Sequence, residues 1–189
     1  MSTGSDTSAA DTSAADVLAF WRAAGPAKWF KKDSAFDAEI ISRFQALWRA
    51  AASGPLSDWE TAAEPALALV IVLDQFPRNM FRGKADAFAT DALARGVAER
   101  AIARSFDQKV PASERLFFYL PFEHSESLTD QERAVALVGT LGNPDLTRWS
   151  ELHADVIRRF GRFPHRNSAL GRATTREEQE YLDAGGFAG

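Results

Sequence analysis

Apolar residues recur at helical spacing along almost the whole chain, and no run alternates for long enough to indicate a β-strand. Phe36, Ile40, Phe44 and Leu47, for example, share one helical stripe. Glycine and proline interrupt the pattern at intervals that suit short connections between helices. The spacing predicts about eight helices, over residues 17–24, 34–54, 65–76, 88–105, 112–119, 129–142, 145–160 and 175–185. We therefore expect an all-α fold.

Helix starts are indicated by serine or threonine followed three residues later by an acid, because each side chain can bond the other residue's backbone N–H. Four such pairs precede a predicted helix and are taken as helix starts: Ser34 with Asp37, Ser57 with Glu60, Thr129 with Glu132, and Thr175 with Glu178. The Ser57 pair precedes Pro65, which suits the start of the apolar helix over 65–76. Pro121 should end or kink the helix before it.

Size and charge narrow the class of protein. The 189 residues, 46% of them apolar, are enough for one domain with a proper core. The formal charge of −4 argues against binding to nucleic acid or an anionic membrane, and the lack of cysteine excludes disulfides. The first fifteen residues are small and polar, without the features of a signal peptide. We expect a disordered tail at 1–15, one helical domain at 16–187 and a cytoplasmic location.

Asp74 breaks the apolar pattern of its helix. It continues the stripe of Leu67 and Ile71 and lies in the last turn, where the helix dipole disfavours an anion. A carboxylate in that position needs a cation, and Arg78 or Arg82 is the nearest. We favour an internal ion pair that holds the following Phe-Pro turn. The alternative is that Asp74 orients one of these arginines towards a ligand.

A second polar segment, Glu123-His124-Ser125-Glu126, follows the aromatic run that includes Tyr119. Acids and a histidine beside a proline and an aromatic wall could line a pocket with shifted pKa values. If this turn is helical, Glu123 and Glu126 could share one face. A solvated loop in which Glu123 pairs with an arginine explains the segment equally well.

The third segment, residues 158–172, holds five arginines, one histidine and no acid. Its Phe163-Pro164 turn and Asn167 favour an ordered loop that presents Arg162, His165 and Arg166. Arginine forks suit carboxylate or phosphate groups. The same arginines could instead be neutralised by carboxylates of the chain, such as Glu126, and both interpretations stay open.

Most familiar catalytic and metal motifs are absent. The sequence has no Gly-rich phosphate loop and no Gly-x-Ser-x-Gly elbow. His153 falls on an apolar stripe, where a histidine is more often a hydrogen-bonded core residue than a ligand. A metal site built from His153, His165 and Glu123 is the least favoured alternative, and we expect no cofactor and no metal.

The same segments resemble one known family, the bacterial and plant proteins with domain of unknown function 924. The motifs are residues 73–83, 119–126 and 160–167, followed by Leu170-Gly171-Arg172 and Tyr181-Leu182. The resemblance covers residues 16–187. It implies a helical fold grouped with tetratricopeptide-like arrays, although the repeat signature is missing here. It implies no activity.

We expect the three motifs to converge on one polar pocket that holds a small anionic ligand, a phosphate ester or a carboxylate. The predicted ligand-binding residues are Arg78, Arg82, Arg162, Arg166, Glu126 and Asn167. The predicted supporting residues are Asp74, His153 and Tyr119, and the candidates for a catalytic role are Glu123, His165 and His124.

Two other functions remain open at this level. The first is a hydrolase- or transferase-type enzyme in which Glu123 or His165 acts as general base and Arg166 clamps the anion. The second is a helical scaffold that binds a peptide or a protein partner, an idea that rests on the fold resemblance alone.

Overall fold

The computed structural model describes residues 12–54 and 56–188, and within them the chain is helical with no β-strand. The predicted all-α single domain is thus confirmed. Residues 1–11 of the predicted tail lie outside the described residues, whereas Ala14 already begins a helix capped by Ser13. None of the helices in these residues has the length and apolar character needed to cross a membrane.

Eight α-helices of eight residues or more make up most of the described chain. They are α1 (Ala14–Ala24), α3 (Ser34–Ala52), α4 (Ala63–Val70), α6 (Asp91–Ala103), α7 (Leu116–Glu123), α8 (Leu128–Gly139), α9 (Pro144–Phe160) and α10 (Arg176–Asp183). Shorter pieces lie between them: α2 (Pro26–Trp29), η2 (Ser57–Thr61), the π-helical η3 (Ile71–Gln75), α5 (Phe76–Met80), η4 (Ala85–Phe88), η5 (Asp107–Lys109) and η6 (Pro164–Arg166). The predicted tetratricopeptide-like array stays a prediction.

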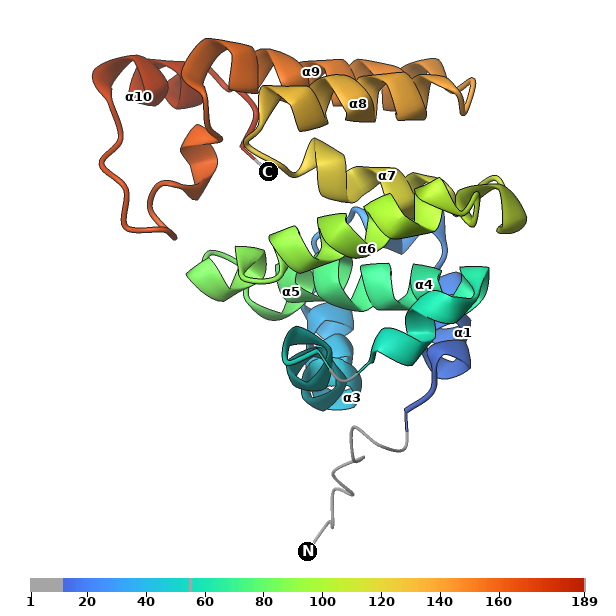
Figure 1. Ribbon diagram of the computed structural model, residues 1–189. Coiled ribbons are helices and arrows are strands. Elements are labelled where there is room, and N and C mark those ends of the chain that lie inside the picture. Colours follow the sequence, from blue (N-terminus) through green and yellow to red (C-terminus); the bar gives the residue numbers. More distant parts are fainter. Residues whose placement is uncertain (1–11, 55, 189) are drawn as a thin grey trace, which may run out of the picture.

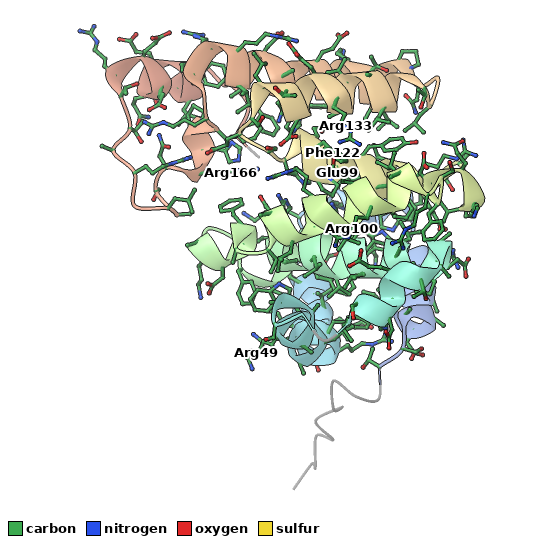
Figure 2. All side chains as sticks on the ribbon, in the orientation of Figure 1. Arg49, Glu99, Arg100, Phe122, Arg133 and Arg166 are labelled. Carbon is green, nitrogen blue, oxygen red and sulfur yellow. The ribbon has the colours of Figure 1, made fainter. Side chains whose placement is uncertain are left out.

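The helices form layers: α4, α6, α7, α8 and α9 pack on one another in chain order, whereas α1 packs on α4 and α3 packs on α5. Figure 1 shows α9 over α8, then α7, α6 and α4, with α1 and α3 at the base. Polar contacts also join layers: Arg133 of α8 contacts Glu99 of α6 at 2.9 Å and lies over the ring of Phe122 in α7 (Figure 2). Short connections allow this order, since neighbours in sequence are neighbours in space.

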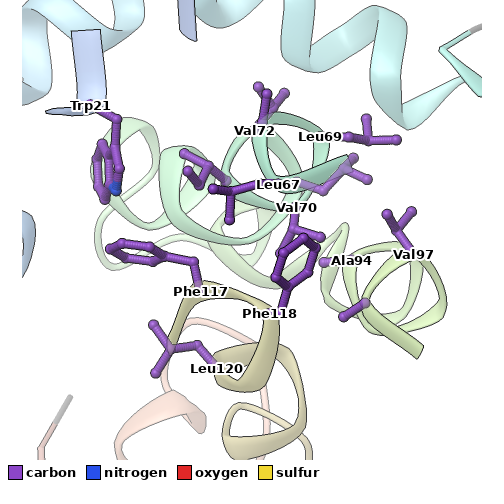
Figure 3. Packing of buried hydrophobic residues seen from close by; sticks show 14 of the residues in the cluster. Trp21, Leu67, Leu69, Val70, Val72, Ala94, Val97, Phe117, Phe118 and Leu120 are labelled. Atoms are coloured by element: carbon purple, nitrogen blue, oxygen red, sulfur yellow. The ribbon is translucent and has the colours of Figure 1, made fainter. Parts of the chain in front are cut away.

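Aromatic and branched side chains fill the main core between α1, α3, α4, α6 and α7. The rings of Trp21 and Phe117 meet edge to face with their centroids 5.5 Å apart (Figure 3). Every residue of α7 is buried, including Pro121, and the helix continues past this proline to Glu123. The helix therefore does not end at Pro121, which was one of the two outcomes expected there. Burial of the aromatic residues on both sides outweighs the single backbone hydrogen bond that proline removes.

The predicted helix over 65–76 is longer than expected and contains a π-helical turn, η3, between α4 and α5. Pro77 has no N–H, so the carbonyl of Leu73 loses its partner four residues on. The hydroxyl of Thr90 donates to this carbonyl at 2.5 Å, and it accepts from the indole N–H of Trp48 at 3.1 Å. Thr90, which follows η4, thus supplies the hydrogen bond that Pro77 cannot donate to the α4–α5 segment.

Only one of the four predicted capping pairs forms as expected. Thr175 and Glu178 bond each other's backbone N–H groups and open α10. Helix α3 is capped by Asp33, one residue before Ser34. No side chain caps α4 or α8. Ser57 opens the short 3₁₀ segment η2 that precedes α4, and α8 begins before Thr129. Aspartate, serine and threonine can all cap a helix, so a pattern at one offset leaves the choice open.

The C-terminal segment has an apolar cluster of its own, separate from the main core. Gly161, with a φ of 67°, ends α9 in the left-handed conformation and lets the chain turn back beneath it. Phe163 then packs with Val156 and Ile157 of α9. The segment after α9 therefore meets the rest of the protein largely through polar side chains, which form the candidate site.

Candidate functional site

The first two motifs meet at Asp74, which is fully buried on η3. One carboxylate oxygen, Oδ1, lies 2.8 Å from Nδ1 of His124, and the other accepts a hydrogen bond from the Gln75 amide at 2.6 Å. Arg78 approaches Oδ1 at 3.4 Å, so the predicted internal ion pair is present. Burial by itself would raise the pKa of Asp74, but Arg78 and His124 more than offset it and lower that pKa to about 2.

Arg78 links this pair to α6. Its guanidinium makes two hydrogen bonds to the carboxylate of Asp91, at 2.9 and 3.1 Å, and a third to the backbone carbonyl of Asp74 at 2.6 Å. Paired N–H donors facing two carboxylate oxygens give a strong and directional contact. Asp91 was not predicted as a site residue. Its position at the start of α6 looks like an ordinary helix-terminal acid in the sequence.

The third motif joins the cluster through Arg166 of η6, which lies between the C-terminal segment and the helices beneath it (Figure 2). The guanidinium lies 4.5 Å from the ring centres of both Phe88 and Phe163. It has one carboxylate contact, 3.4 Å to Asp91, and its side chain is 7% exposed. Burial, with the nearby charge of Arg78, lowers the pKa of Arg166 to about 10. This arginine is poorly neutralised compared with Arg78.

Three buried nitrogen atoms of residues 158–172 have no hydrogen-bond partner among residues 12–54 and 56–188. They are Nε of Arg166, Nδ1 of His165 and Nε of Arg172. The His165 ring packs against Phe163 and Phe187, and burial lowers its pKa to about 3. The ring is therefore neutral at physiological pH.

Glu126 and Arg172 hold the C-terminal segment onto α7 and α8. The arginine donates to both carboxylate oxygens, at 2.7 and 3.0 Å, and Glu126 also accepts from the backbone N–H of Phe163 at 2.8 Å. Burial would raise the pKa of Glu126, but Arg172 and the backbone N–H lower it. The sequence does not indicate this pair, because nothing in it connects Arg172 with an acid 46 positions away.

Glu123 and Glu126 do not share a face, as they would if the turn were helical, because α7 ends at Glu123. Glu123 is 5% exposed, and burial raises its pKa to about 7, with a further contribution from Asp74. Its Oε1 lies 3.3 Å from Nδ1 of His153, which also contacts the Trp149 carbonyl at 2.7 Å. Burial lowers the pKa of His153 to about 4. His153 is thus a hydrogen-bonded core residue, as favoured.

The remaining predicted residues lie in other contacts. Arg82 pairs with Asp37, not with Asp74, and Arg162 binds both carboxylate oxygens of Glu178, at 2.6 and 2.9 Å. Two more predicted residues bond to buried carboxylates: Asn167 contacts Glu178 at 3.2 Å, and the hydroxyl of Tyr119 donates to Asp107 at 2.8 Å. Arg82 and Arg162 are therefore neutralised internally, whereas Arg166 has, within the described residues, only the longer contact with Asp91 at 3.4 Å.

The three motifs thus converge on a charged cluster. Two hollows in the described surface, one between α1 and α3 and one beside Leu56 and Val97, include none of the predicted site residues. Nor do His153, His165 and Glu123 form a metal site: no group of three His, Asp or Glu side chains in the described chain could hold a metal ion.

Comparison with known proteins gives a family and a related structure. The family described as bacterial protein of unknown function (DUF924) matches residues 17–186. A solved structure of a protein of unknown function from Agrobacterium tumefaciens is 51% identical in sequence, with a TM-score of 0.88. The match covers 90% of this chain and 97% of that one. No curated protein matches the chain.

Proposed function

Because the chain belongs to the DUF924 family, for which no function is known, its own site is the basis for a function, and we propose that the cluster around Arg166 binds a small anion. The ligand class is a carboxylate or a phosphate ester. The observation that supports this most directly is a nine-tenths buried guanidinium with an Nε–H that has no acceptor in the described residues.

A buried N–H of a charged group that lacks an acceptor lowers the stability of the folded state by about 1–3 kcal/mol or more. Evolution tolerates such groups mainly where a ligand or water completes them. The rings of Phe88 and Phe163 both lie 4.5 Å from the Arg166 guanidinium, whose N–H donors point outward in its own plane. An arginine edge matches two oxygens of a carboxylate or phosphate. His165 Nδ1, on the adjacent residue, supplies a second donor when it carries the ring proton.

Charge balance also favours an anion at Arg166 rather than at Arg78. Asp74 and the bidentate contact of Asp91 neutralise Arg78, whereas Arg166 shares Asp91 at the longer distance of 3.4 Å. The cluster reaches the surface, since the side chains of Arg78, Asp91 and His124 are 20%, 14% and 14% exposed. Water and small solutes can therefore reach the cluster on the side of Arg78, Asp91 and His124.

A thermal-shift experiment tests this function. Inorganic phosphate, acetate and succinate are titrated against chloride at matched ionic strength. A ligand at about 100 times its dissociation constant adds ~2.7 kcal/mol, which is roughly 5–10 °C for a chain of this length. We expect at least one oxyanion to raise the melting temperature and Arg166→Gln to abolish that rise.

Arg162→Gln is the matched control, because it removes an arginine of the same segment that Glu178 already neutralises. It should lower the melting temperature but keep the oxyanion-dependent increase. An equal increase in wild type and Arg166→Gln, or none with any of the three oxyanions, would overturn the proposal.

A further inference from the structure

The hydrogen bond between Asp74 and His124 determines the tautomer of the histidine. Asp74 is held ionised by Arg78, and an ionised carboxylate can only accept. Nδ1 of His124, at 2.8 Å from Asp74 Oδ1, must therefore carry the proton. In the neutral ring this leaves Nε2 with a free lone pair, which is the form of imidazole that accepts a proton.

The pair is oriented from the interior towards the surface. Asp74 is fully buried, whereas the His124 side chain is 14% exposed. Nε2 of His124 has no partner within the described chain, yet it is not among the sealed, unsatisfied atoms. The carboxylate thus lies behind the ring, and the free nitrogen is on the side that water or a small molecule can reach.

The groups around the ring keep it neutral and place positive charge nearby. The ring contacts Asp74 of η3, and the charges of Arg78 from α5 and Asp91 from α6 also act on its pKa. Burial, and then the charge of Arg78, lower the pKa of His124, although Asp74 opposes this. Asp74 itself belongs to a π-helical turn, a local distortion that is frequent at functional sites.

We propose that His124 is a catalytic general base that activates water, with Asp74 as its positioning residue. Nε2 takes one proton from water while the water oxygen bonds to the carbonyl carbon of a bound carboxylic ester. The imidazolium then returns the proton to the alcohol oxygen as the carbon–oxygen bond breaks, which leaves an acid and an alcohol. The proposal rests on the proposed function in one respect, that Arg166 holds a negative group of the natural substrate.

The first test is the tautomer of His124 in the wild-type protein, measured from ¹⁵N chemical shifts of the three histidines at pH 7. We expect His124 to be neutral with the proton on Nδ1, and Asp74→Asn to shift the proton towards Nε2. His124→Asn assigns the signal. Asp107→Asn, which removes another buried carboxylate, is the control and should leave the His124 signal unchanged. A proton on Nε2 in the wild type would overturn the proposal whether or not any variant folds.

The second test is hydrolysis of 4-nitrophenyl acetate. General-base catalysis contributes about 10²–10⁴-fold, so His124→Asn and Asp74→Asn should each lose at least about tenfold of the protein-dependent rate. Asp107→Asn should keep it. Arg162→Gln, which removes an arginine that Glu178 already neutralises, should also keep it. Because this ester is uncharged, its hydrolysis does not require the anion site, which separates failure of the base from failure of that site. A wild-type rate in folded His124→Asn contradicts the proposal.

Discussion

Arg172 and Glu126 form a two-fold hydrogen-bonded ion pair, with Nη1 to Oε2 at 2.7 Å and Nη2 to Oε1 at 3.0 Å. The same arginine donates to the Phe163 carbonyl at 3.1 Å, while Glu126 accepts from the Phe163 N–H. One side-chain pair thus binds both backbone groups of the residue that covers Arg166. This contact ties the third motif to the segment between α7 and α8.

The strength of this connection can be measured with Glu126→Gln. The substitution keeps the shape but removes the charge-assisted hydrogen bonds, which are worth about 1.5–3 kcal/mol each when well formed. Both side chains are roughly a quarter exposed, so we expect a smaller net loss, about 1–2 kcal/mol of unfolding free energy. Urea denaturation provides the measurement. Glu132→Gln on the exposed face of α8 is the control, and equal stability of both variants would show that Glu126 contributes nothing.

Glu123 should make stability depend on pH between about 5 and 7. Its pKa is about 7 in the folded protein and near 4.5 unfolded, so the folded state binds more protons in this window and stability falls as pH rises. The full effect corresponds to about 3 kcal/mol above pH 7. Glu123→Gln cannot ionise, so its stability curve should lack this decline. Parallel curves for wild type and variant from pH 5 to pH 8 would contradict the assignment.

The two threonines of the predicted capping pairs make a matched comparison. Thr175 bonds the Glu178 N–H at the start of α10, whereas Thr129 lies exposed within the first turn of α8 and caps nothing. Thr175→Ala should cost about 1 kcal/mol, and Thr129→Ala should stay within about 0.5 kcal/mol of wild type. Thermal unfolding of both variants checks this. The reverse order would place the helix start at Thr129.

Thr90→Val tests how the proline-containing segment is completed. The change keeps the volume but removes the hydroxyl that bonds the Leu73 carbonyl and the Trp48 indole. Two buried polar groups would lose their partner, so we expect a loss of about 1–3 kcal/mol. Thr140→Val, which removes an exposed hydroxyl after α8, is the comparison. A Thr90 variant as stable as this control would mean that solvent replaces the hydroxyl.

The location of the site could be predicted from the sequence, but most of its pairing could not. Asp74 stood out as an acid on an apolar stripe, and Arg78 was near enough along the helix to be named as its partner. Asp91 and Phe88 had no distinguishing signal, since an acid at a helix start and an aromatic residue in a short loop are common. His124 was one of three catalytic candidates, and only its contact with Asp74 separates it from Glu123 and His165.

The sequence by itself determined the helical class, most of the helix positions and the three polar segments. These follow from apolar periodicity, glycine and proline, which act over a few residues. Which charges neutralise one another follows from the tertiary structure alone. It pairs Arg82 with Asp37, Arg162 with Glu178 and Arg172 with Glu126, and it leaves Arg166 with a longer contact to Asp91 at 3.4 Å. The physical reason is that ion pairing depends on distances of a few ångströms between atoms from distant parts of the chain, and the packing of the layers sets those distances.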